Sequence, residues 1–315
     1  MISENWANLL TPGLRMVFRT RMRAREELYK RTAIFPTDTS QRAFEDFQGV
    51  GELSTKGWDE FELTGRVPYD APDPWYKTRL EHREFAKGIS VKRKLMDDNL
   101  YPGAPIPRTI TQRVEILADS AALYREKSAA EVFINAFTDT GVDSAGFPVA
   151  GADGVGLVST AHPLGPSNAA TQSNEFTLAL TAANLQTVKL AMREFTDDTG
   201  EMIASHPDTL VIPPELEETA WQINMCPTEV GTANNTPNIQ RGRWNIVVWD
   251  YLTDANAWFV LDSALKGQHL MWLDRIMPEF NAEMNKDTMI GEWVAYMRFS
   301  RGWDAWQWLS GSNPG

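Results

Sequence analysis

The chain has 315 residues, of which 43% are hydrophobic and 23% charged, and its net charge at pH 7 is −12. This is the composition of a globular protein, and the length predicts about two domains with a core that needs no disulfide or metal. Cys226 is the only cysteine, which excludes an intrachain disulfide. The sequence has no run of about 18 apolar residues and no secretory signal, so neither a membrane-spanning helix nor secretion is expected.

The first 31 residues form a basic segment ahead of an acidic remainder. They hold seven basic and three acidic side chains, a net charge near +4, which leaves about −16 for the rest. Thr11 and Pro12 are typical of a helix start, so we expect a basic helix from there to about Arg31. Such a segment either contacts a negative partner, such as nucleic acid or another subunit, or is a solvated helix face. Its basic residues are Arg15, Arg19, Arg21, Arg23, Arg25, Lys30 and Arg31.

Residues 60–94 are expected to form a long, polar β-hairpin. Apolar and polar side chains alternate from Phe61 to Val67 and again within 75–94, and a turn-rich stretch at 68–74 separates the two runs. Charged side chains fall on both faces, and an isolated two-stranded hairpin is only marginally stable in water. The hairpin therefore needs a further surface, either on a neighbouring subunit or on its own domain.

The strongest helix prediction covers residues 107–138. Apolar side chains recur there every three or four residues from Ile110 to Ala136, which is the period of an amphipathic helix. Thr109 and Gln112 fit a capping box at its start. At a rise of 1.5 Å per residue, such a helix would be about 45 Å long.

Shorter helices and strands are predicted to follow without regular strand–helix alternation, so the fold class is α+β. Thr181 caps a second amphipathic helix, and Pro213 and Pro214 open a third. The predicted strands are residues 209–212, a pair at 244–249 and 257–261 joined by a turn at 253–256, residues 268–275, and a closing strand at 293–299.

No arrangement of residues indicates a catalytic, metal or cofactor site. The four histidines form no zinc-binding pair, and His162 and His206 each precede a proline and are interpreted as turn residues. Residues 151–156 (GADGVG) superficially resemble a phosphate loop, but they lack its lysine and favour a glycine-rich hairpin turn. Cys226 is interpreted as a buried structural thiol and the twelve tryptophans as core and interface residues. Together with the basic segment and the polar hairpin, these observations favour an assembly protein.

Six stretches carry a family resemblance over most of the chain from about residue 80 onward. They are Ile116–Phe137, Leu157–Leu164, Leu190–Glu218, Gly231–Asn235, Val247–Asp262 and Phe299–Ser310. In combination they resemble the major capsid proteins of tailed phages, in particular the Mu-like major head subunit family. Residues 1–80 match that family only in layout.

The resemblance implies the Hong Kong 97 capsid fold and a structural subunit that is not an enzyme. The implied parts are an N-terminal arm at 1–50, an extended loop hairpin at 51–100, a peripheral domain at 101–180 with its spine helix at 107–138, an axial domain at 181–280, and a return to the peripheral domain at 281–315.

The implied function is self-assembly into hexamers and pentamers of an icosahedral shell that encloses double-stranded phage DNA. The virion shell would be assembled in the cytoplasm of the host bacterium. Expected partners are other copies of the chain, packaged DNA bound non-specifically at the inner face, a portal and a decoration protein. A separate scaffolding protein is also expected, because the fold is predicted to begin close to Met1.

Inter-subunit contacts are expected at basic and aromatic side chains of the arm and the hairpin. These residues are Arg15, Arg19, Arg23, Arg66, Trp75, Tyr76, Arg79, Arg83, Lys87 and Lys92. The alternative function is an encapsulin-type nanocompartment shell, which would hold a cargo enzyme in place of DNA. An enzyme with a dispersed active site is a third hypothesis, and it would require clustered carboxylates or histidines in the fold.

Overall fold

The computed structural model describes residues 6–53, 71–94, 108–228, 237–285 and 289–315, with five single residues between 53 and 71. The chain divides into two compact units, each built from segments that are far apart in the sequence. Unit 1 comprises Met1–Phe44, Glu81–Ala129 and Trp272–Arg301, and unit 2 comprises Glu45–Leu80, Ala130–Met271 and Gly302–Gly315.

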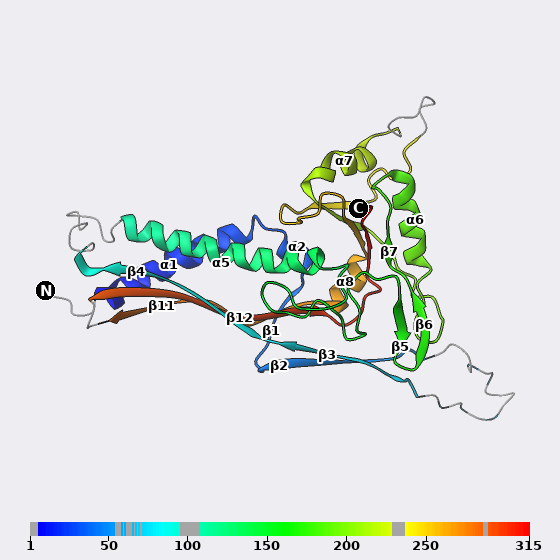
Figure 1. Cartoon of the computed structure of the whole chain (residues 1–315), viewed down its shortest axis with the longest axis horizontal. Helices are drawn as coiled ribbons and strands as arrows, with labels where there is room; N and C mark the ends of the chain where they lie inside the picture. The colour runs from blue at the N-terminus through cyan, green and yellow to red at the C-terminus, as the bar shows by residue number, and fades with distance from the viewer. Residues whose placement is uncertain are drawn as a thin grey trace. The chain divides into compact units, whose positions relative to one another are not determined.

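Unit 1 is a four-stranded sheet with two long helices on one face (Figure 1). Its strands are, in spatial order, β1 (Thr37–Thr39), β11 (Leu270–Asn285), β12 (Ile290–Trp303) and β4 (Arg83–Lys92). Its helices are α1 (Trp6–Glu26), the short α2 (Arg31–Ile34) and α5 (Arg108–Ile134), whose last turn belongs to unit 2. β1 is parallel to β11, whereas β4 is antiparallel to β12 over ten residue pairs.

One apolar core holds α1 and α5 on the sheet of unit 1. Leu14, Phe18 and Met22 recur every four residues, so they form a single stripe along α1, and all three are buried. The stripe packs with the apolar face of α5, with Trp293 of β12 and with Phe280 of β11, whose ring stacks on that of Phe18 at 5.3 Å. Full burial of each such side chain contributes roughly 1.5–3 kcal/mol.

A buried ion pair joins α5 to β11 within the same unit. Arg125 donates from both Nη atoms to the Asp274 carboxylate at 2.8 Å each, and both side chains are almost fully buried. The Trp272 indole donates to Asp274 Oδ1 at 3.0 Å, and the two arginines Arg31 and Arg125 lie over the Trp272 ring, 4.8 and 5.3 Å from its centroid. Both arginines also reach Glu26, at 3.2 and 3.0 Å. Burial, and then the nearby charge of Arg125, lower the pKa of Arg31 from its ordinary value.

Among its described residues, unit 2 contains a five-stranded mixed sheet, three helices and two smaller ribbons. The sheet order is β7 (Glu175–Phe176), β13 (Leu309–Ser312), β10 (Trp258–Leu261), β8 (Thr209–Ile212) and β9 (Asn245–Val248). The helices are α6 (Ala182–Arg193), α7 (Glu217–Met225), preceded by the 3-10 turn η1 (Pro214–Leu216), and α8 (Ser263–His269). The ribbons pair β2 (Phe44–Val50) with β3 (Pro74–Glu81), and β5 (His162–Gly165) with β6 (Asn168–Gln172).

Alternate residues of the central strands face opposite sides of this sheet, as the strand geometry requires. Leu210 and Trp258 belong to the core that includes Val188 of α6. Phe259, the next residue of β10, instead packs edge-on against Phe133, with ring centroids 5.3 Å apart. The sheet therefore carries apolar side chains on both faces, which is why β8 and β10 are buried throughout.

Several predicted elements are confirmed. The long helix is present as α5, although it ends at Ile134 and not at 138, and Thr109 lies inside it and is not its cap. β8 has the predicted limits of 209–212. Thr181 caps α6, because its side chain accepts the Asn184 backbone N–H at 3.1 Å. The segment 151–156 is a tight turn closed by the Gly151 N–H and the Val155 carbonyl at 2.7 Å.

Two predictions in unit 2 are wrong. The strands predicted as a pair at 244–249 and 257–261 are not neighbours, because β8 lies between β9 and β10 and pairs in parallel with β9. Residues 263–269 form α8, where a strand was expected to begin at 268. The helix forms because Asp262 caps it by accepting the N–H groups of Ala264 and Leu265.

The predicted limits of the basic helix are also wrong at both ends. α1 already includes Trp6, so Pro12 lies inside the helix and Thr11 does not cap it. Pro12 has no backbone N–H to donate, yet the helix continues through it, and Pro12 itself is exposed. The helix ends at Glu26, and Arg31 starts the separate helix α2.

The described part of the predicted hairpin is divided between two sheets. β4 pairs with β12, and β3 pairs with β2. The other predicted strand, residues 61–67, lies outside the described residues except for Gly65 and Val67, so its pairing stays a prediction.

Replacement of Arg125 by alanine should destabilise the protein by about 3–5 kcal/mol, because it leaves the Asp274 charge buried and unpaired. Chemical denaturation measured by circular dichroism checks this value. The matched control is Arg19→Ala on the exposed side of α1, which should change stability by no more than about 0.5 kcal/mol. Equal effects of the two substitutions would contradict the role of the pair.

Gly156→Ala should also destabilise the protein, by roughly 1–3 kcal/mol. A Cβ at this position would lie 2.8 Å from the carbonyl oxygens of both Ala136 and Thr138, so the backbone would have to shift. The control is Gly267→Ala in α8, where an added Cβ meets nothing within 4 Å and alanine favours the helix. Thermal unfolding of both variants tests the difference, and a stable Gly156→Ala protein would refute the close packing.

Candidate assembly surfaces

Where a histidine pairs with a carboxylate in the part of the chain that the structure describes, it pairs with a single one, as His269 does with Asp304 at 2.9 Å. No group of three or more His, Cys, Asp or Glu there could hold a metal ion. His82 is buried, with its Nε2 2.9 Å from Ser40 Oγ and its Nδ1 2.9 Å from Ser300 Oγ. Cys226 is half-buried at the end of α7. Among the described helices, none combines the length and apolar content needed to cross a membrane.

His162 is a core residue and not the turn residue that its neighbouring proline indicated. It opens β5 with a side chain that is 1% exposed. Its ring stacks on Trp306 at 4.4 Å with an interplanar angle of 13°, and its Nδ1 lies 2.8 Å from the Asp153 carboxylate. This contact ties the tight turn at 151–156 to β5.

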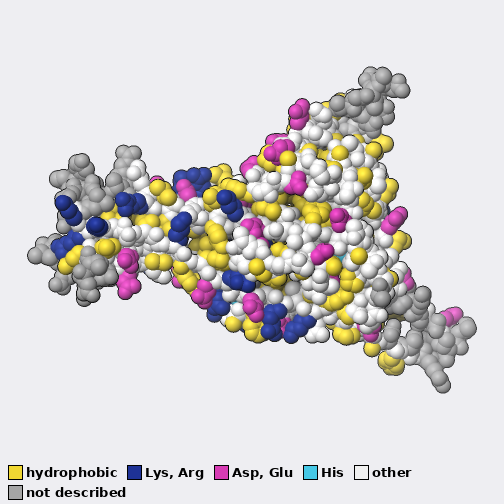
Figure 2. All heavy atoms as spheres, viewed as in Figure 1, with side chains coloured by type: hydrophobic (Ala, Val, Ile, Leu, Met, Phe, Trp, Pro, Cys, Tyr) yellow, Lys and Arg dark blue, Asp and Glu magenta, His cyan; other side chains and the backbone are white. Residues whose placement is uncertain are grey.

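An exposed basic stripe runs along α1. Arg15, Arg19 and Arg23 recur every four residues and therefore share one face of the helix. All three are exposed, beside Met16, which is 72% exposed. Arg15 is anchored by its Nε, which donates to the Phe280 carbonyl at 3.2 Å. Figure 2 shows dark blue side chains gathered over the helices of unit 1.

The two other arginines of this part of α1 turn toward α5. Arg21 and Arg25 donate from Nε to the Asp119 carboxylate at 2.8 and 2.9 Å. Burial alone would raise the pKa of Asp119, but the hydrogen bonds from both arginines outweigh it and lower that pKa. This double ion pair fixes the rotation of α1 on α5, and thus which face the exposed stripe occupies.

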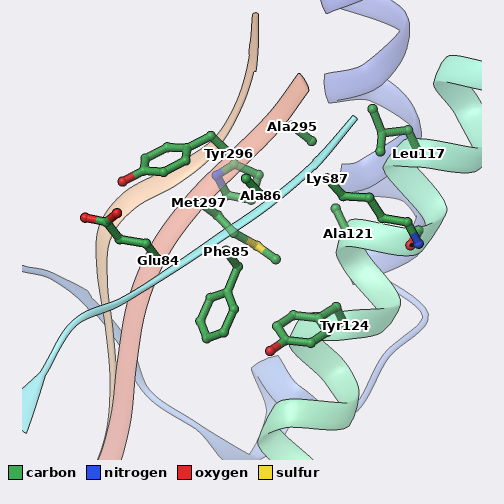
Figure 3. Close-up of a pocket in the computed structure, with 12 residues that line it drawn as sticks. Glu84, Phe85, Ala86, Lys87, Leu117, Ala121, Tyr124, Ala295, Tyr296 and Met297 are labelled. Carbon is green, nitrogen blue, oxygen red and sulfur yellow. Dashed lines mark hydrogen bonds between the residues drawn. The ribbon is translucent and has the colours of Figure 1, made fainter. Parts of the chain in front are cut away.

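A cavity of about 360 Å³ lies between α5 and the strands β4 and β12 (Figure 3). The rings of Phe85 and Tyr124 meet at 4.9 Å beside Met297, and these side chains make its wall largely apolar. Lys87 extends from β4 toward α5 and donates to Ser120 Oγ at 3.0 Å. Lys87, an expected inter-subunit contact, thus has a partner within its own chain.

A second group of expected contact residues lies on β3. Arg79 binds Asp46 of β2 through its Nε at 2.7 Å, and Lys77 reaches the same carboxylate at 2.9 Å. Hydrogen bonds from Arg79, and then from Lys77, hold the pKa of Asp46 far below its ordinary value. This ion pair ties the two strands of the ribbon together on a surface that water reaches.

Trp75 and Tyr76 are half-buried at the start of β3, with rings 5.7 Å apart in an edge-on contact. Two glycines make room for Trp75. A Cβ on Gly49 would lie 2.7 Å from its ring, and one on Gly165 would lie 3.1 Å from it. The indole is therefore wedged within unit 2.

Three of the expected inter-subunit contacts remain, two on β4 and one outside the described residues. Arg83 and Lys92 are exposed on β4, and Arg66 lies outside the described residues. The nine described residues of the set thus fall on three elements, α1, β3 and β4.

The two units carry opposite net charges, which the sequence did not reveal. Unit 1 holds 21 lysines and arginines against 16 aspartates and glutamates, a net charge of +5. Unit 2 holds nine basic against 26 acidic side chains, a net charge of −17. Each unit is built from segments that are separated in the sequence. The charge pattern along the sequence therefore shows only the basic N-terminal segment and not the opposite charges of the two units.

The chain matches a family model. The model is described as phage capsid protein and matches residues 77–309, which is well over half of the chain. No curated protein sequence matches the chain significantly.

Solved structures share the fold at low sequence identity. The chain resembles a structure of Mycobacterium phage Patience with a TM-score of 0.55 at 12% identity, covering 97% of this chain and 87% of that one. A structure of Microbacterium phage Oxtober96 gives a TM-score of 0.54 at 10% identity, with 91% of each chain covered. The SrpI encapsulin of Synechococcus elongatus gives 0.51 at 10% identity, covering 90% and 86%.

These likenesses show the fold, which is the α+β fold of Hong Kong 97-type capsid proteins. The described residues include exposed basic and aromatic side chains, such as Arg19 and Trp221. Because the family model matches most of this chain, the chain belongs to the phage capsid protein family and is a structural component of the virion shell.

Proposed function

We propose that this capsid protein forms hexamers and pentamers of an icosahedral shell around double-stranded DNA, and that the basic stripe of α1 contacts acidic surfaces of neighbouring copies. The observation that carries the proposal is the position of Arg15, Arg19 and Arg23. They lie exposed on a helix whose neighbouring face, about 100° around the axis, packs into the core of unit 1.

The stripe is unfavourable for the isolated chain. Like charges four residues apart on a helix repel each other and destabilise it slightly. A negatively charged partner would offset this repulsion between the arginines. Unit 2 of a neighbouring copy, with its net charge of −17, is such a partner. Many weak contacts of this kind sum to a stable shell when each subunit makes several at once.

Other parts of the proposal follow the family resemblance. Residues 1–50 would act as an arm, the loop 51–100 would reach across a neighbour, and residues 181–280 would form the axial domain. DNA at the inner face, a portal, a decoration protein and a separate scaffolding protein are the proposed partners, and the host bacterial cytoplasm is the proposed place of assembly. The likeness to the Mu-like head subunits also stays a prediction.

A nanocompartment shell is the second candidate, because the SrpI encapsulin has the same fold. The two functions differ in what the particle encloses. A phage shell holds nucleic acid, whereas an encapsulin-type shell would hold a cargo enzyme.

The chain expressed with its neighbouring genes should form closed particles visible by negative-stain electron microscopy. Purified particles should contain nuclease-protected DNA and no stoichiometric second enzyme. A protected enzyme without DNA would favour the nanocompartment, and a chain that stays monomeric under all these conditions would refute shell assembly.

Reversal of the stripe by the triple substitution Arg15→Glu, Arg19→Glu and Arg23→Glu should reduce the yield of particles by roughly tenfold or more, because several favourable charge contacts become repulsive in each copy. The matched control replaces the same three residues by lysine, which keeps the charge and should preserve assembly. Sedimentation measures the particle fraction. A full yield of shells that lack DNA would instead assign the stripe to nucleic acid and exclude the subunit contact.

A further inference from the structure

An exposed apolar ridge with a carboxylate runs along the outer side of α7. Glu217, Trp221 and Met225 recur every four residues, so they share one face of the helix, and we call them the α7 ridge. Trp221 is 59% exposed and Met225 is 48% exposed. A tryptophan this exposed beside a methionine is typical of a protein interface, because both residue types are enriched there.

The other side of α7 borders an open groove, here called the α6–α7 groove, of about 710 Å³. It lies between α6, α7 and residues 238–243, and α7 contributes Thr219, Gln222 and Ile223 to its wall. With 3.6 residues per turn, this set lies roughly 140° around the helix from the ridge. Ridge and groove are therefore on nearly opposite sides of one helix.

Polar and apolar groups in the groove match a ridge of this kind. Gln186 and Gln222 supply amide donors and acceptors, and Ile239, which is 67% exposed, supplies an apolar surface. Gln186 accepts a hydrogen bond from Gln240 at 2.8 Å, which holds the two walls together.

Arg243 gives the groove a positive charge, although unit 2 as a whole is strongly acidic. Arg243 lines the groove, and Lys189 and Arg193 follow Gln186 along α6. Lys189 Nζ lies 5.1 Å from the centroid of the Trp244 ring, and burial, followed by the charges of Arg243 and Arg193, lowers the pKa of Lys189. Unit 2 has only nine basic side chains, and three of them gather here.

We propose that the α7 ridge of one copy inserts into the α6–α7 groove of the next copy. Glu217 would meet the positive charge of the groove, and the Trp221 ring would accept a cation–π contact from an arginine such as Arg243. Two different surfaces meet in this contact, so it is heterologous, and heterologous contacts close into rings when the rotation permits. This inference rests on the proposed shell function and assigns the contact that builds its rings.

Charge exchange tests the proposal in the full chain expressed under shell-forming conditions. Glu217→Arg and Arg243→Glu should each reduce the yield of particles by roughly tenfold or more, and the double variant should restore most of it, because the reversed charges again attract each other across the contact. Trp221→Ala should reduce the yield similarly, as expected for a central interface tryptophan. Met202→Ala is the matched control, since Met202 is also exposed in unit 2 but lies outside the ridge and the groove.

Circular dichroism of each variant separates lost assembly from lost folding. Wild-type yields from both charge variants, or a double variant no better than the single ones, would overturn the ridge–groove contact while the shell function stood. A wild-type chain that forms no particles would overturn the shell function and this contact together.

Discussion

The buried pairing of Arg125 with Asp274 is the constraint on which the arrangement of unit 1 depends. Two charges that have left water must stay paired and hydrogen-bonded, since an unpaired one costs several kcal/mol. The pair therefore fixes α5 against β11, and Trp272 and Glu26 extend the fixed network to the end of α1. Glu26 holds the end of α1, and the pairing of Arg21 and Arg25 with Asp119 then sets which face of the helix is exposed. Charge pairs within unit 1 thus set which face of α1 carries the exposed arginines.

Function in this protein lies in surfaces and not in a reactive centre. The buried histidines are held by neighbouring side chains: His82 lies between two serine hydroxyls, and His162 stacks on Trp306. The surfaces instead combine charge of opposite sign in the two units with exposed apolar groups such as Met16 and Trp221. Complementary charge sets the orientation and rate of encounter, and the apolar groups supply contact area. A subunit that must meet copies of itself in several environments benefits from both.

Sequence patterns predicted helices whose periodicity and caps involve only residues close together in the sequence. The period of apolar residues located α5, and the Thr181 cap located the start of α6. Strand order was not predictable in the same way, because the parallel pairing of β8 with β9 joins segments that no turn connects. Asp262 is a residue type that favours the start of a helix, but α8 was not predicted there. A strand was predicted from residue 268 because the first residues of β11, which follow, are apolar. For the assembly surfaces, the spacing of arginines on α1 was visible, whereas the partners of Lys87 and Arg79 inside the chain depend on tertiary structure.

The most direct test of this account is a cryo-electron microscopy map of the assembled particle at side-chain resolution, read at the two proposed surfaces. The account predicts that Arg15, Arg19 and Arg23 lie against acidic groups of a neighbouring copy, and that Trp221 is buried in the groove of the next subunit of a ring. A particle in which the arginine stripe and Trp221 both face open solvent would contradict it.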